Sequence, residues 1–110
     1  MPLEIPLEAP IMLKVETSSP EWITQRIKHY AGIYGVSEIT MSNIIKCESG
    51  FNPNAINSTS KEYSVGLVQI NLMAHDIEED EAKDVDFALD FLASNLKVGR
   101  GNMWTCFKYR

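Results

Sequence analysis

The stretch ESGFNPNA occupies residues 48–55, and its first residue, Glu48, stands at the end of a helical pattern. Met41, Ile44, Ile45 and Glu48 are spaced three, one and three residues apart, which places all four on one face of a helix. A carboxylate is not expected on the apolar face of a helix, because burial disfavours its charged form. Glu48 is therefore the first candidate for a functional residue.

A second segment, GLVQIN at residues 66–71, follows the first. The patterns Glu-Ser-x-Phe-x-Pro-x-Ala and Gly-Leu-x-Gln-Ile, in this order, resemble the signature of the lytic transglycosylase and goose-type lysozyme superfamily, over residues 20–107 or so. The resemblance implies an α+β lysozyme-like fold. We expect a small, mainly α domain with a substrate cleft and a loop or short β segment at about residues 50–65.

The chain departs from that signature in three places. The segment between Ala55 and Gly66 is longer than usual, and it ends in Ser64-Val65 where small Ala or Gly residues are typical. The downstream Ala-Tyr-Asn motif, which supplies a cleft tyrosine in many relatives, is absent. Tyr109 cannot be equated with that tyrosine. The loop geometry is thus the part of the site that the resemblance leaves open.

Length, composition and charge limit the classes of protein to consider. The chain has 110 residues, 45% of them hydrophobic and 23% charged, as expected for one ordinary globular domain. Its net charge of -5 argues against nucleic acid as a partner, since phosphate binding requires clustered Lys and Arg. The charge also argues against a cationic protein that finds anionic envelopes electrostatically.

The N-terminal residues differ in composition from the rest. Residues 1–10 contain three prolines and a repeated Pro-Leu-Glu, and they lack the basic start and uninterrupted apolar core of a secretory signal. We expect residues 1–17 to form an extended arm or linker and residues 18–110 to form the lysozyme-like domain. No apolar run approaches the roughly 20 residues that a membrane-spanning helix needs.

Capping residues and apolar spacing predict three helices. Ser19 can cap the first, with Pro20 at its first position, Gly35 as its end, and a buried face of Ile23, Ile27, Tyr30, Ala31 and Tyr34. Ser37 can cap the second, which carries Glu48 near its C-terminal end.

The third helix and the connections follow from the same signals. Asp84 can cap this helix, Gly99 can end it, and its buried side is expected to hold Ala88, Phe91, Leu92 and Asn95. Residues 50–65 have the composition of a loop, residues 66–74 predict a short buried helix or turn, and the acidic run at residues 78–81 predicts solvated surface.

The role that the resemblance implies for Glu48 fits the demands of glycosidic cleavage. The leaving oxygen is weakly basic, so the acid must stay protonated near neutral pH, which burial among apolar side chains favours. In lytic transglycosylases one Glu donates this proton at the bond between N-acetylmuramic acid and N-acetylglucosamine. The same Glu then takes the proton of the muramyl 6-hydroxyl, which closes a 1,6-anhydro ring. A hydrolytic relative needs a base to activate water, and Glu62, Asp76, Asp84 and Asp86 are all candidates for it.

Five further residues are candidates for binding substrate: Ser49, Asn57, Tyr63, Gln69 and Trp104. Ser49 follows the acid as in the family, and Gln69 resembles the family glutamine that faces the cleft. Asn57 stands where many relatives have Ser near the sugar, and Tyr63 and Trp104 offer flat faces on which sugar rings stack. Simpler roles remain open: capping for Ser49, pairing with buried backbone groups for Gln69, and core packing for Trp104.

The two cysteines are Cys47, beside the proposed acid, and Cys106. An even count permits one disulfide without proving it. The bond would tie the C-terminal segment to the helix of Glu48, stabilise the fold by about 4 kcal/mol in the entropic model, and imply an oxidising compartment. Two buried thiols in a cytoplasmic protein are the alternative. His29 and His75 are expected to be surface or satisfied histidines, and no metal-ligand spacing and no cofactor signature is found.

The sequence therefore predicts an enzyme that cleaves the glycan strands of peptidoglycan. We expect it to act outside the cytoplasm, in the periplasm or cell envelope or as a secreted or virion-associated protein. A lytic transglycosylase is the first expectation, and goose-type hydrolysis is the nearest alternative. Two alternatives come from other classes: a wall-binding or assembly module that has lost turnover, and a piece of a phage tail or secretion apparatus that opens a local hole.

Overall fold

Residues 20–110 are described by the computed structural model, and they form a mainly helical domain with one small antiparallel sheet. The helices are α2 (Glu21–Tyr34), α3 (Glu38–Ser49), α4 (Glu79–Lys83) and α5 (Val85–Lys97), followed by the 3-10 helices η3 (Gly101–Met103) and η4 (Thr105–Tyr109). This architecture confirms the predicted fold class. The expected arm at residues 1–17 lies outside the described residues.

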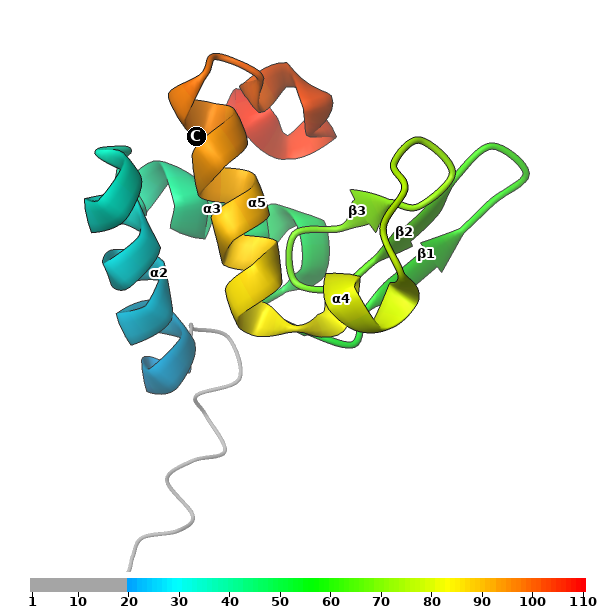
Figure 1. Ribbon diagram of the computed structural model, residues 1–110, viewed down its shortest axis with the longest axis horizontal. Coiled ribbons are helices and arrows are strands. Elements are labelled where there is room, and N and C mark those ends of the chain that lie inside the picture. Colours follow the sequence, from blue (N-terminus) through cyan, green and yellow to red (C-terminus); the bar gives the residue numbers. More distant parts are fainter. Residues whose placement is uncertain (1–19) are drawn as a thin grey trace, which may run out of the picture.

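The sheet consists of three short strands in sequence order, β1 (Ile56–Ser58), β2 (Tyr63–Val65) and β3 (Ile70–Asn71). Strands β1 and β2 form the short β segment expected near residues 50–65, and Ser64 of β2 pairs with Asn71 of β3. Residues 66–69 form a turn, one of the two forms expected for residues 66–74, and β3 follows it directly. Figure 1 shows the sheet beside the helices, with α5 between α2 and the strands.

The core lies among α2, α3 and α5 and extends into the buried residues of the adjoining β2, turn and β3 (Figure 1). Ile23 and Ile27 of α2 are fully buried, as expected, and so are Ile44 and Ile45 of α3. The buried side of α5 is rotated relative to the prediction and consists of Ala88, Leu89, Leu92 and Ala93. Phe91 and Asn95 are only partly buried, because this side of α5 borders a cavity and the C-terminal segment.

Two of the three predicted caps are confirmed. The Ser37 hydroxyl accepts a hydrogen bond from the Thr40 N–H at 3.1 Å, and the Asp84 carboxylate accepts from the N–H groups of the first turn of α5. The start of α2 differs, since Pro20 is its N-cap in an extended conformation rather than its first helical residue. Gly35 ends α2 as expected.

The acidic run at residues 78–81 is not only solvated surface. Glu78 and Glu81 form a capping box, in which each side chain accepts from the other residue's N–H, and α4 begins there. Carboxylates are favourable in a first helical turn, because the N–H groups at that end carry partial positive charge. The acidic run expected to be solvated surface therefore also starts a short helix.

Gly66 is the residue that lets the turn before β3 pass close to α4. We expect Gly66→Ala to lower the free energy of unfolding by about 3 kcal/mol or more, because the new Cβ would lie 1.9 Å from the Ala82 carbonyl oxygen. The φ of Gly66, +91°, adds strain for any L side chain. Urea unfolding followed by circular dichroism measures the loss.

Gly35→Ala is the matched control, because φ there is also positive, at +68°, but nothing lies within 4 Å of the added Cβ. We expect it to cost only about 1 kcal/mol. Equal losses in the two variants would show that the close approach of Gly66 to α4 is not tight.

Candidate active site

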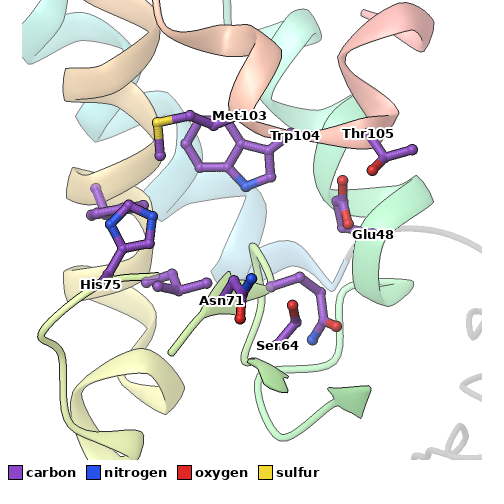
Figure 2. Close-up of a pocket in the computed structure, with 10 residues that line it drawn as sticks. Glu48, Ser64, Asn71, His75, Met103, Trp104 and Thr105 are labelled. Carbon is purple, nitrogen blue, oxygen red and sulfur yellow. The ribbon is translucent and has the colours of Figure 1, made fainter. Parts of the chain in front are cut away.

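One cavity lies where α3, the sheet and the C-terminal segment meet, and Glu48 lines it. On the side of the sheet, the cavity is lined by Ser64, Gln69, Ile70 and Asn71. The other lining residues are His75, Phe91, Met103, Trp104 and Thr105. Figure 2 shows Glu48 at one side of the cavity, with Trp104 and Met103 above and Ser64 and Asn71 below. Of the predicted site residues, Glu48, Gln69 and Trp104 are thus brought together.

Glu48 projects from the last turn of α3, which ends at Gly50 with φ +63°. The apolar residues that share its helix face, Met41, Ile44 and Ile45, are fully buried, so this face of α3 is anchored in the core. Glu48 itself is half-buried at the cavity, and its Oε2 accepts a hydrogen bond from the Cys106 N–H at 3.1 Å. The acid is therefore held by both its own helix and the C-terminal segment.

Burial raises the pKa of the Glu48 carboxyl above its ordinary value of 4.5. The Cys106 N–H opposes this shift because it stabilises the charged form, whereas the negative charge of Glu62 adds to it. The net effect favours the protonated acid. A carboxyl group that keeps its proton beside a cavity can donate that proton to a bound molecule.

A disulfide joins Cys47 to Cys106, and both cysteines are used by it. The bond ties η4 to α3 one residue away from Glu48 and places the Cys106 N–H near the carboxylate. The C-terminal segment therefore forms part of the acid's surroundings.

Gln69 adopts a left-handed backbone conformation, φ +57°, which is uncommon for a residue other than glycine. Its side-chain Nε2 donates to the Ala55 and Gly66 carbonyls at 3.1 and 3.0 Å, so the amide holds the turn in this conformation. Gln69 therefore has the simpler of its two expected roles, pairing with buried backbone groups. Because Gln69 also lines the cavity, its Oε1 is the atom left to accept from a substrate.

Three predicted binding residues do not line the cavity. Ser49 donates its hydroxyl to the Leu67 carbonyl at 2.6 Å and so ties the end of α3 to the turn before β3. Tyr63 donates its hydroxyl to Glu79 at 2.7 Å, and Asn57 is exposed on β1. Contacts of these residues with a long substrate stay predictions.

An aromatic row forms part of the cavity wall. The rings of His75 and Phe91 lie 5.3 Å apart and those of Phe91 and Trp104 5.9 Å apart, each pair edge to face. Trp104 is 5% exposed, and its Nε1 donates to the Val68 carbonyl at 2.7 Å. Trp104 thus packs in the core and lines the cavity at once. His75, expected to be a surface or satisfied histidine, belongs to the same wall.

The candidate bases for water differ in what surrounds them. Asp84 caps α5 and Asp86 pairs with Arg26 at 2.7 Å, so both have structural partners away from the cavity. Asp76 is exposed and does not line the cavity. Glu62 accepts a hydrogen bond from Ser64, which does line it.

Residues 20–110 hold no group of three or more His, Cys, Asp or Glu side chains arranged to bind a metal ion. In the same residues, no helix has the length and apolar character needed to cross a membrane.

Comparison with protein families gives one match. The family model described as transglycosylase SLT domain matches residues 25–108, a span that includes every residue lining the cavity. Neither the curated proteins nor the solved structures give a significant match.

Proposed function

Because this chain belongs to the transglycosylase SLT domain family, we propose that it cleaves the β-1,4 bonds between N-acetylmuramic acid and N-acetylglucosamine in peptidoglycan as a lytic transglycosylase. Residues 18–110 are the catalytic unit in this proposal. The observation that carries it is Glu48, half-buried at the cavity with a raised pKa. Glu48 is also the one carboxylate among the cavity-lining residues of the described chain.

In the first step, the Glu48 proton passes to the glycosidic oxygen as the bond from that oxygen to C1 breaks. Positive charge develops on the muramyl ring at this point. Glu48, now a carboxylate, takes the proton of the muramyl 6-hydroxyl while that oxygen bonds to C1. The product is a 1,6-anhydro end, and Glu48 regains its proton without consuming water.

The surrounding residues support the binding of a sugar chain. The edge-to-face row of His75, Phe91 and Trp104 gives the cavity a rigid apolar wall, against which a sugar face can pack. On the other side, the Oε1 of Gln69 and the side chain of Asn71 offer polar groups to hydroxyl and acetamido groups.

The Cys47–Cys106 disulfide supports action outside the cytoplasm, where peptidoglycan is exposed, because disulfides persist in oxidising compartments. We propose the periplasm, the envelope or an extracellular site as the place of action.

Incubation of the purified protein with peptidoglycan tests the proposed function. We expect soluble muropeptides with 1,6-anhydro ends, which mass spectrometry identifies because they are lighter than hydrated ends by one water. Binding to sacculi without any released product would favour the wall-binding module instead.

The pH dependence of cleavage follows from the raised pKa of Glu48. The acid must be protonated to act, so kcat/KM falls as pH rises through its pKa, and a raised pKa moves that fall to higher pH. We therefore expect the alkaline limb of the profile to lie above 4.5, the ordinary value for this group. A loss of activity centred at or below that value would mean that burial does not protect the proton.

A further inference from the structure

We propose that this site also hydrolyses the glycan strand, with Ser64 and Glu62 together activating a water molecule. This inference rests on the proposed function, because it uses the same bond cleavage by Glu48. It adds a second reaction, in which water competes with the 6-hydroxyl to bond to C1 of the positively charged muramyl ring. The site then releases hydrated ends as well as anhydro ends.

Ser64 is the residue that carries the argument. It is 2% exposed on β2, pairs with Asn71 on β3, and lines the cavity together with Glu48. Its hydroxyl donates to the Glu62 carboxylate. A serine hydroxyl has a single proton to donate, so with that proton turned to Glu62 the oxygen meets the cavity as an acceptor. Figure 2 shows the Ser64 hydroxyl at the cavity, where a water or sugar hydroxyl can donate to its oxygen.

Glu62 stands at the end of the β1–β2 hairpin, directly before β2. Its carbonyl accepts from the Thr59 N–H at 2.8 Å, which fixes the backbone at this position. Among residues 20–110 no ion pair neutralises the Glu62 carboxylate. Its negative charge also reaches Glu48, since it contributes to the raised pKa of that acid. Glu48 is thus held toward the protonated form as the acid, and we assign to Glu62, through Ser64, the role of the base.

The hydrolytic step balances as follows. Glu48 gives its proton to the glycosidic oxygen, and the bond from that oxygen to C1 breaks. The water oxygen then bonds to C1 and loses one proton to the Ser64 oxygen, while the original Ser64 proton moves to Glu62. Glu62 afterwards returns a proton to solvent and Glu48 takes one up. One water is consumed for each bond that is cut.

The ratio of hydrated to anhydro muropeptides, measured by mass spectrometry, tests this inference. We expect both kinds of end from the wild-type protein. Glu62→Gln keeps the shape of the side chain but cannot take the proton, so the ratio should fall about tenfold or more. Ser64→Ala should lower it likewise, and Ser64→Thr, which retains the hydroxyl, should restore it. Asp76→Asn is the matched control, because it removes an exposed carboxylate outside the cavity lining, and it should leave the ratio unchanged.

The outcomes separate this inference from the proposed function. Anhydro ends alone from wild type would overturn the hydrolytic step and leave the transglycosylase proposal intact. A mixture whose ratio does not respond to Glu62→Gln would also overturn it. Hydrated ends alone, converted to anhydro ends by Glu62→Gln, would support the Ser64–Glu62 step and replace the transglycosylase outcome for wild type. No product at all from wild type would remove the proposed function, and this inference with it.

Discussion

Glu48→Gln lowers kcat/KM for glycan cleavage by about a thousandfold, as expected when a general acid is lost. Glutamine has nearly the same shape, and its carbonyl oxygen can still accept from the Cys106 N–H, so the cavity is retained. Only the transferable proton is removed. Release of soluble muropeptides from purified sacculi, measured at several substrate concentrations, gives kcat/KM for both proteins.

Glu38→Gln provides the matched control on the same helix. Glu38 lies in the first turn of α3 and does not line the cavity, so the same change of a carboxylate to an amide should leave cleavage within about twofold of wild type. If Glu48→Gln and wild type release equal amounts of product, Glu48 is not the acid.

Removal of the disulfide has the second largest expected effect. The double substitution of Cys47 and Cys106 by alanine should lower the free energy of unfolding by about 4 kcal/mol, because the bond closes a loop over a sequence separation of 59. For a domain of this size the melting temperature should fall by about 15 °C. Thermal unfolding followed by circular dichroism measures the change.

Activity should fall together with stability in that variant. Cys106 donates its N–H to Glu48, and Trp104 and Thr105 line the cavity just before it, so loosening η4 disturbs the site directly. Wild type treated with reductant should behave like the double variant. Asn43→Ala, an exposed substitution on α3, controls for changes to the helix itself. An unchanged melting temperature in the double variant would show that the disulfide adds no stability to this fold.

Local signals in the sequence predict the three longer helices, whereas α4 is missed although its capping box is also a local signal. Ser37 and Asp84 act as caps because a side-chain oxygen needs only the N–H groups two or three residues ahead of it. The other errors occur where segments distant in the sequence decide the structure. The rotation of the α5 core face depends on the cavity and the C-terminal segment beside it, and β3 exists because residues 70–71 pair with β2.

The same distinction applies to the site. Glu48 and Gln69 belong to sequence motifs, and both line the cavity. Ser64 and His75 belong to no motif, and they reach the cavity through strand pairing and loop packing that one sequence does not reveal. Side chains alternate between the two faces of a strand, so a residue of β2 paired with Asn71 lies on the same face of the sheet as Asn71. This rule could have suggested Ser64 once the pairing of the strands was known. Met103 and Thr105 had only one sequence signal, their position on either side of Trp104.

Whether Glu48 stays protonated to a higher pH than an ordinary glutamate can be measured directly. Carbon-13 NMR of the side-chain carboxyl carbons, with Glu48→Gln to assign its signal, follows the titration of this one group. We expect a midpoint above 4.5 for Glu48 in the folded protein. A midpoint at or below 4.5 would contradict it, because the carboxyl would then be ionised where the enzyme must donate a proton.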